Sequence, residues 1–358
     1  MKRFKNILVV FDSKIDNRAL FIQAVDLAQR NQAALMIVDV IEEAPQMPER
    51  PTGQQQPGEV QTPEIQIIED FQIDTLIPPA SESMVDGWKG VVPVPEKPTI
   101  DIQEFILKEE QHSFQQFVAA VQQAGIQVNS KTLYGIPFIK IIQEVLRSQH
   151  DLVMITAEGR GGLRETLFGN TTMHLMRKCP CPVWVIKPGQ PRQFGRILAA
   201  VDLVQDDKDR TALNTKIIEL ATSLARLGQS ELLIIHAWRM YGESILRGRG
   251  GFSTEEIESL LRETHDEHRL WLIELLQQHP LEDLKYKVYL LNGEAGALIP
   301  ELAQAKAIDL IVMGTVSRAG IAGLLIGNTA EKVLHQVDCS MLTIKPEGFI
   351  TPVKLDLV

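Results

Sequence analysis

"GTVSRAGIAGLLIGNTAEKVL", residues Gly314–Leu334, is a glycine-rich stretch that directly follows the apolar run Leu310–Met313. A second stretch of the same kind, "TAEGRGGLRETLFGNTTMHLM" at Thr156–Met176, directly follows the apolar run Leu152–Ile155. Each stretch reaches Gly-Asn-Thr immediately before residues with helical periodicity. The sequence therefore predicts two strand–loop–helix units of the same design, and this duplication decides the fold.

The duplication extends over most of the chain. "FKNILVVFD" at Phe4–Asp12 aligns with "FGRILAAVD" at Phe194–Asp202. Towards the ends of the copies, "CPCPVWVIKP" at Cys179–Pro188 aligns with "VDCSMLTIKP" at Val337–Pro346. A repeat of this length indicates a duplicated domain rather than a solenoid unit.

The two copies differ in length because the first contains an insertion. We expect a first domain at residues 1–190, with the insertion at about residues 42–100, and a second domain at residues 191–358. The insertion is rich in Pro, Gln and Glu and has no apolar period, so it is predicted to be an extended arm without a core of its own. A lid over a binding site is the alternative interpretation.

Each copy alternates short apolar strands with amphipathic helices. Runs such as Ile7–Phe11 and Leu152–Ile155 are continuously apolar, which is typical of strands buried on both faces of a parallel sheet. Strands that alternate with such helices predict an α/β fold of two tandem doubly wound, open, parallel five-stranded sheets, Rossmann-like in architecture. In such sheets ligands bind beyond the carboxyl ends of the strands, where the winding reverses.

Composition narrows the function classes. The chain has 358 residues, of which 44% are hydrophobic and 23% charged, as in a globular protein with material for two cores. Its net charge of −10 argues against a general nucleic-acid binder. The three cysteines are too few for a disulfide framework, and no stretch has the length of a transmembrane helix or the character of a signal peptide. We therefore expect a cytoplasmic protein without nucleic-acid or membrane partners.

The glycine-rich stretches have two physical interpretations. A glycine-rich turn that leaves a buried strand and enters a helix exposes backbone N–H groups at the positive end of that helix, which favours phosphate binding. Alternatively, Gly-Asn-Thr is a simple helix start, with Asn as the N-cap residue. Spacing alone leaves both interpretations open.

The strand-ending acids Asp12 and Asp202, the two loops, the duplication and the tail "IKPEGFITPVKLD" at Ile344–Asp356 resemble the universal stress protein family, in particular its tandem, E-type members. The resemblance implies an adenine nucleotide alpha hydrolase-like fold and a stress-response protein that binds ATP or a related nucleotide as a signalling module. In nucleotide-binding members, loop glycines and a hydroxyl residue hold the phosphates. The strand-ending Asp lies near the adenosine, and an apolar residue of the second strand packs on the adenine.

Carried over to this chain, the resemblance implies one candidate nucleotide site in each copy. The first comprises Asp12, Val40, Gly159, Gly169 and Asn170, and the second comprises Asp202, Ala237, Gly314, Ser317, Gly327, Asn328 and Thr329. Both depart from the family pattern, since Thr156 and Ser317 replace glycines, and Asn170 and Asn328 replace hydroxyl residues. The residues of the second loop are smaller than those of the first loop, and fewer of them are charged. We therefore expect the second copy to bind ATP more tightly.

No catalytic or metal site is expected. Cys179 and Cys181 have no second pair to complete a zinc site and are interpreted as structural. His265 and His268 are interpreted as part of a solvated, charged helix face, and His236 as a residue that lines the pocket. Because no nucleophile elbow or Walker motif is present, at most slow ATP hydrolysis is expected.

Two further expectations concern partners. The edge strands Val183–Ile186 and Met341–Ile344 are expected to pair within one chain as a pseudo-dimer, because exposed sheet edges invite aggregation. The alternative function is a scaffold, or a carrier of an apolar ligand, in which the nucleotide sites have degenerated. Protein partners are not identified by the sequence.

Overall fold

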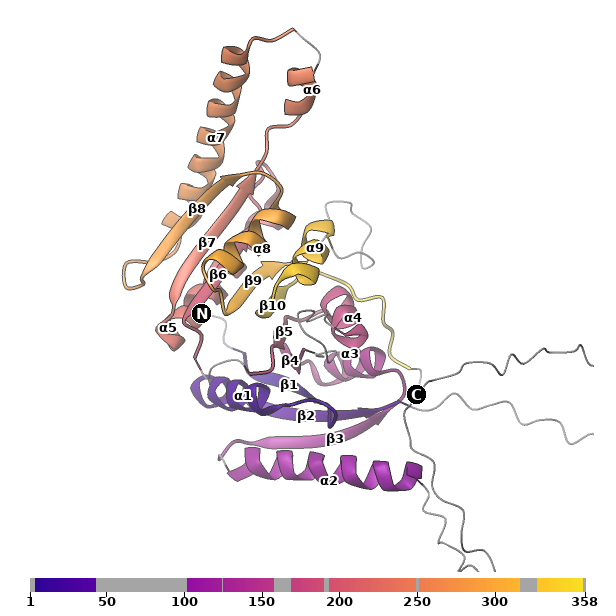
Figure 1. Ribbon diagram of the computed structural model, residues 1–358. Coiled ribbons are helices and arrows are strands. Elements are labelled where there is room, and N and C mark those ends of the chain that lie inside the picture. Colours follow the sequence, from indigo (N-terminus) through magenta and orange to yellow (C-terminus); the bar gives the residue numbers. More distant parts are fainter. Residues whose placement is uncertain are drawn as a thin grey trace, which may run out of the picture. The chain divides into compact units, whose positions relative to one another are not determined.

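The computed structural model describes residues 4–42, 102–123, 125–157, 169–189, 193–248, 251–315 and 327–356. Within this part the strands form one sheet of ten, in the order β3-β2-β1-β4-β5-β10-β9-β6-β7-β8 (Figure 1). Almost all of the insertion, together with Gly159 and Ser317, lies outside the described residues.

Each copy supplies one half of this sheet. The first half consists of β1 (Asn6–Phe11), α1 (Arg18–Asn31), β2 (Ala34–Ile41), α2 (Ile102–Gln123), β3 (Val128–Tyr134), α3 (Pro137–Ser148), β4 (Leu152–Thr156), α4 (Asn170–Lys178) and β5 (Val183–Ile186). The second half consists of β6 (Arg196–Val201), α5 (Lys208–Gly228), β7 (Glu231–Trp238), α6 (Glu243–Gly248), α7 (Thr254–Gln277), β8 (Tyr286–Asn292), α8 (Ala295–Ala305), β9 (Leu310–Gly314), α9 (Asn328–Gln336) and β10 (Ser340–Ile344).

All strand neighbours within a half are parallel, as the continuous apolar runs predict. The two halves are joined by β5 and β10, which pair antiparallel with Leu342 opposite Trp184. The predicted doubly wound, five-stranded parallel sheets are therefore present, and they are fused into one continuous sheet.

Helices cover both faces of the sheet. Apolar residues of α1, α2, α5 and α7 pack in one cluster with alternate strand residues such as Ile7 and Leu310. Residues of α3, α4, α8 and α9 pack on the other face with the intervening strand residues, such as Leu8 and Ile311. We call these the α1/α5 face and the α4/α9 face.

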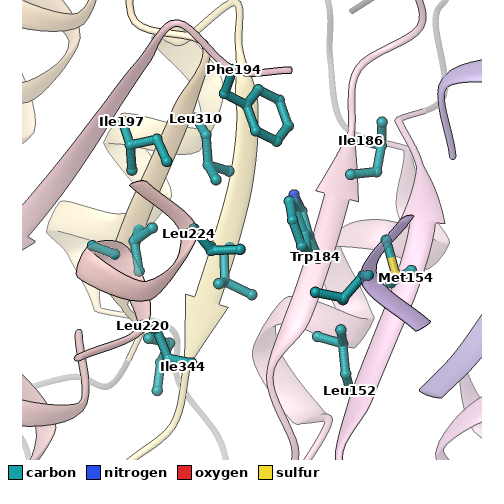
Figure 2. Close-up of a cluster of buried hydrophobic side chains, with 14 of the residues drawn as sticks. Leu152, Met154, Trp184, Ile186, Phe194, Ile197, Leu220, Leu224, Leu310 and Ile344 are labelled. Carbon is teal, nitrogen blue, oxygen red and sulfur yellow. The ribbon is translucent and has the colours of Figure 1, made fainter. Parts of the chain in front are cut away.

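The junction between the halves is packed on both faces. On the α1/α5 face, the Trp184 ring of β5 lies 5.9 Å from the Phe194 ring, and Figure 2 shows Trp184 between side chains of the two halves. On the α4/α9 face, Arg177 of α4 pairs with Glu331 of α9 at 2.6 Å. The two halves therefore share a core in addition to their strand pair.

Two aligned acids hold the start of each half. Asp151 accepts hydrogen bonds from the backbone N–H groups of Lys5 at 2.6 Å and Asn6 at 3.0 Å. Asp309 accepts the corresponding bonds from Gly195 at 2.7 Å and Arg196 at 2.9 Å. The acids that precede β4 and β9 thus fix the first strand of each half, which gives this repeated residue a structural role.

The C-terminal tail crosses from the second half to α3 of the first half. Gln143 is 1% exposed, and its amide donates to the Lys354 carbonyl and to the Asp356 carboxylate, both at 2.9 Å. Lys140 pairs with Asp356 at 3.0 Å, and Val353 packs against the cluster on the α4/α9 face. The tail is therefore held by one buried amide and by charges on α3.

Only the first half has the residues that hold the tail. The helices α3 and α8 correspond, because each follows a glycine with φ in the left-handed region, Gly135 at 121° and Gly293 at 149°. This alignment places Glu301 of α8 at the position of Gln143. A carboxylate there offers no donor and repels Asp356, so the tail is directed to α3.

We expect Gln143→Glu to lower the free energy of unfolding by about 2 kcal/mol, because a buried carboxylate would face two acceptors without donating to either. Urea denaturation at pH 7 measures this change. The reciprocal variant Glu301→Gln, at an exposed position of α8, should stay within about 0.5 kcal/mol of the parent. Equal effects of the two substitutions would contradict the role of Gln143 as the tail anchor.

Candidate functional site

The winding of each half reverses between its first and fourth strands, that is, between β1 and β4 and between β6 and β9. In open parallel sheets, the carboxyl ends of the strands at such a point are where ligands bind. Both sets of sequence-predicted residues follow these strand ends or lie at the ends of their neighbours β2 and β7.

In the second half, strand register brings three residues to one level. The pairing of β6 with β7 and with β9 places Asp202, Ala237 and Thr315 side by side at the carboxyl edge. On each strand, the residue two positions earlier belongs to the cluster on the α4/α9 face. Since strand side chains alternate between faces, Ala237 lies on the face that α9 covers. Thr315 bonds to the Met176 carbonyl of α4 on the same face, whereas Asp202, beyond the end of β6, contacts Arg210 of α5.

The start of α9 is tied to this edge. The Gly327 N–H donates to the Thr315 carbonyl at 3.2 Å, and Gly327 is the N-cap residue of the helix. Thr329 is exposed in the first turn. The positive end of α9 therefore lies directly beyond β9, at the level of Asp202 and Ala237.

The first half repeats this arrangement. The registers of β1 with β2 and with β4 place Asp12, Val40 and Ala157 at one level, and α4 begins at Asn170 after Gly169. The N-cap residues are therefore Gly169 and its counterpart in α9, and the interpretation of Asn as N-cap is wrong. Asn170 and its counterpart are the first helical residues because the preceding glycine has the extended backbone of a cap.

Gly314 and Thr156, which the sequence aligned, face away from α9 and α4. A Cβ at Gly314 would lie 2.7 Å from Leu213 of α5. The Thr156 hydroxyl is buried and bonds to Asn17, just before α1, at 3.2 Å. The difference between glycine and threonine at this position therefore acts on packing against α5 and α1. It leaves the space in front of α9 and α4 unchanged.

Sequence reasoning missed the charge partner of Asp202. Arg210 in the first turn of α5 pairs with Asp202 at 3.1 Å and with Asp207 at 2.9 Å. Asp207 also caps α5 by accepting from the Arg210 N–H at 3.0 Å. An acid three residues before the arginine is a helix-start signal that was present in the sequence. Only the fold shows that the same arginine reaches Asp202.

A buried lysine connects the second loop to the first half. Lys345 is 4% exposed, and its amine donates to the Met176 carbonyl of α4 at 2.6 Å and to the Thr315 hydroxyl. Burial lowers the pKa of Lys345 to about 7. Its aligned counterpart Lys187 is more exposed and donates to the Asp338 carbonyl at 2.9 Å. The two copies thus use the same lysine differently.

The histidines differ from the sequence interpretation. His236 is 1% exposed, and its Nε2 lies 2.8 Å from Nδ1 of His268, which is only half-buried. The interpretation of His268 as part of a solvated helix face is therefore wrong, because α7 turns it toward the end of β7. His265 keeps a contact with Asp266 at 3.2 Å, as a charged helix face predicts.

The cysteines match their structural interpretation in position. Cys179 is buried at the end of α4, its sulfur lies 3.5 Å from that of Cys181, and both are free thiols. Among the described residues, no group of three or more His, Cys, Asp or Glu side chains is placed to hold a metal ion.

A cavity of about 480 Å³ lies at the opposite, amino end of β6, β7 and β9. Its lining includes Glu231, which pairs with Lys287 at 2.9 Å and with Arg196 at 3.3 Å. These contacts lower the pKa of Glu231. The charges of this cavity are satisfied by one another, and it is separate from the carboxyl edge where the predicted residues meet.

Residues 3–187 and 193–345 each match the Universal stress protein family. Universal stress protein E of Escherichia coli (strain K12) is 33% identical over 235 residues, which are 65% of this chain and 73% of that protein. Universal stress protein E of Photorhabdus laumondii subsp. laumondii is 26% identical over 361 residues, covering 99% of both chains.

Solved structures of low identity share the fold. A protein of unknown function from Pseudomonas aeruginosa PAO1 covers 97% of this chain and 94% of its own, with a TM-score of 0.61 at 21% identity. A universal stress protein from Archaeoglobus fulgidus DSM 4304 covers 95% and 98%, with a TM-score of 0.55 at 14% identity. Across the residues that the structure describes, every helix falls short of the length or apolar character needed to span a membrane.

Replacement of Lys345 by methionine tests its ionisation. The pKa of Lys345 in the folded protein lies below its ordinary value of 10.5, so the folded state binds fewer protons than the unfolded state between these values. This lysine therefore makes stability rise with pH. From pH 6.5 to 8.5, the parent should gain about 2 kcal/mol relative to Lys345→Met.

Urea denaturation at several pH values measures this difference, and Lys187→Met is the matched control. Lys187→Met removes the aligned lysine of the first half and shows how much of the change comes from the loss of a lysine as such. The same slope in the parent and in Lys345→Met would show that Lys345 stays charged throughout this range.

Proposed function

Because the chain belongs to the universal stress protein family, we propose that it is a cytoplasmic stress-response protein that binds an adenine nucleotide as a signalling module. The second half is the proposed principal site, at the carboxyl edge of β6, β7 and β9. The residues 1–190 and 191–358 are proposed as the two domains, and the pairing of β5 with β10 as the pseudo-dimer contact between them.

The observation that carries this proposal is the hydrogen bond between the Gly327 N–H and the Thr315 carbonyl. It holds the positive end of α9 at the level of Asp202 and Ala237. One edge therefore carries a helix end that favours an anion, a polar group at Asp202 and a small apolar surface at Ala237. Phosphates would bind the backbone N–H groups of Asn328 and Thr329 in the first turn of α9, because the Gly327 N–H already donates to the Thr315 carbonyl. Asp202 would accept from a ribose hydroxyl, and Ala237 would lie under the base.

The pairing of Asp202 with Arg210 supports the same assignment. An unpaired carboxylate beside a phosphate site would repel a polyanion. Arg210 lies 3.1 Å from the Asp202 carboxylate, which is 53% exposed, so the acid remains accessible while its charge is offset. Arg210 is shared with Asp207, so it offsets part of the negative charge and lessens the repulsion that an adenine nucleotide meets at this edge.

Binding rather than turnover is the proposed activity. Signalling by such a module needs a bound and a free state that partners distinguish, and it does not require rapid hydrolysis. We expect ATP hydrolysis by the purified chain to stay well below about 1 per second, the lower end of typical enzyme turnover. Faster release of phosphate in a coupled assay, lost in Gly327→Val, would instead indicate an ATPase.

Replacement of Gly327 by valine tests the phosphate site. The backbone of Gly327, at φ −61° and ψ 139°, is one that any residue adopts, so valine fills space without straining the chain. We expect Gly327→Val to weaken ATP binding at least about tenfold, roughly 1.4 kcal/mol, in calorimetry on the whole chain.

The matched control is Gly169→Val, at the start of α4, where φ is −62° and ψ is 169°. If the second half is the tighter site, this variant should leave the principal affinity unchanged. A loss confined to Gly169→Val would reverse the ranking, and full affinity in Gly327→Val would show that phosphate does not bind at α9.

Native mass spectrometry of the freshly purified chain separates the proposal from the alternative of a carrier or scaffold. A bound adenine nucleotide supports the proposal. An apolar adduct would favour a carrier in which the departures from the family pattern, such as Asn328 for a hydroxyl residue, reflect a lost nucleotide site.

A further inference from the structure

One pair of corresponding helices contacts the sheet with different chemistry in the two halves. The helices α2 and α7 correspond, since each packs on the α1/α5 face between the second and third strands of its half. Aligning their buried residues Val118 with Leu272 and Val121 with Leu275 places Phe114 opposite His268. In the first half, the Phe114 ring contacts the Phe11 ring at a centroid distance of 5.5 Å. In the second half, the contact at this position is a pair of histidines.

The first half shows that this position can be filled by an apolar contact. A buried His–His pair is a costly replacement, because each ring nitrogen needs a partner when water is excluded. Strand register makes Asp39 the counterpart of His236, since Asp39 pairs in register with Phe11, and His236 with Val201. The first half has neither histidine at these two positions, so the fold does not require them, and the pair is a candidate for a function of the second half.

The hydrogen-bond chain fixes which nitrogens carry protons. Nδ1 of His236 lies 3.3 Å from the Val201 carbonyl, which only accepts, so this nitrogen holds the proton. Nε2 of neutral His236 then accepts from Nδ1 of His268 at 2.8 Å. Nε2 of neutral His268 is therefore left as the basic nitrogen of the pair, at the half-buried end of the chain.

The pair directly adjoins the proposed nucleotide edge. The Val201 carbonyl that anchors it precedes Asp202 in the chain. The His268 ring stacks on Trp238 at 5.8 Å and meets the edge of Trp271 at 4.7 Å. Both rings come from elements that frame the carboxyl edge, the end of β7 and helix α7.

The charges that act on the pair come from two elements, the end of β6 and helix α7. Asp202 at the end of β6 acts on both histidines, and Glu267 and His265 of α7 act on His268. Burial is the dominant cause that lowers the pKa of His268, and it lowers that of His236 to about 4. The pair is therefore neutral at pH 7, and His268 takes up the first proton when the pH falls.

We propose that the His236–His268 pair is a proton-linked element of the second-half site, in which protonation of His268 strengthens the binding of a phosphate-bearing ligand beyond β6 and β9. The inference rests on the proposed function. His268 can gain a proton at Nε2 without losing its bond to His236, because its Nδ1 remains the donor. The added positive charge then acts on the bound anion through the edge that Asp202 and Arg210 occupy.

The direction of the pH effect on affinity follows from the linkage between proton binding and ligand binding. An anion at the edge favours protonated His268, so it raises the pKa of this histidine, and binding takes up a proton as the pH falls. The reciprocal effect is tighter binding at pH 5.5 than at pH 8.0. A rise of about half a pKa unit corresponds to a gain of about threefold in affinity. His236 does not contribute in this range, since its pKa is about 4.

The experiment measures ATP affinity by calorimetry at pH 5.5 and pH 8.0 in the parent and in His268→Asn. Asparagine keeps an N–H donor toward His236 but does not titrate. The terminal phosphate of ATP also titrates in this range, with a second pKa of about 6. Because that effect is common to both proteins, the ratio of their affinities isolates the histidine. We expect this ratio to favour the parent about threefold more at pH 5.5 than at pH 8.0.

Two further variants test whether the pH dependence comes from His268. His268→Phe, which copies the residue of the first half, should abolish the same pH dependence, and His112→Asn, at an exposed position of α2, should keep it. NMR titration of labelled histidines should show the pKa of His268 rising when ATP is added. An identical pH dependence in the parent and both His268 variants overturns the inference alone. Failure of the parent to bind ATP at either pH overturns the proposed function and the inference together.

Discussion

The antiparallel pairing of β5 with β10 is the constraint on which the rest of this structure depends. Each half alone ends in a strand whose backbone groups are unpaired on one side, and an unpaired strand edge is an open template for other chains. Pairing Trp184 with Leu342 closes both edges at once. It also places Trp184 against Phe194 and α4 beside α9, so the core runs through the junction without interruption. The halves are therefore expected to unfold as one cooperative unit.

The same junction brings residues of one half to functional elements of the other. Lys345 is carried by β10, yet it donates to the carbonyl end of α4, whose other end is the candidate anion site of the first half. It also holds Thr315, which fixes the start of α9. A lysine at a helix carboxyl end is favourable electrostatically. In this protein Lys345 also connects the two candidate sites, because its one buried side chain contacts both α4 and Thr315.

The two halves are copies of one fold. The positions at which they differ are positions that this fold does not constrain. The acids Asp151 and Asp309 perform one structural task in both halves. By contrast, the helix position held by Gln143 in one half and Glu301 in the other decides where the tail docks. The contact made by Phe114 in one half and His268 in the other exchanges apolar packing for a hydrogen-bonded pair. Substitutions of this second kind are the positions at which we propose separate roles for the two halves.

The sequence by itself determined the duplication, the parallel strands and the carboxyl-edge position of Asp12 and Asp202, because apolar runs, glycine spacing and helix periodicity are local properties of the chain. It also supplied the acid–arginine spacing around Asp207. It did not determine that Arg210 reaches Asp202, that Gly314 makes room for Leu213, or that His268 turns inward to His236. These contacts join residues on different elements, and their geometry depends on strand register and helix packing. Only the tertiary structure fixes that geometry, since every such contact requires the sheet to be assembled first.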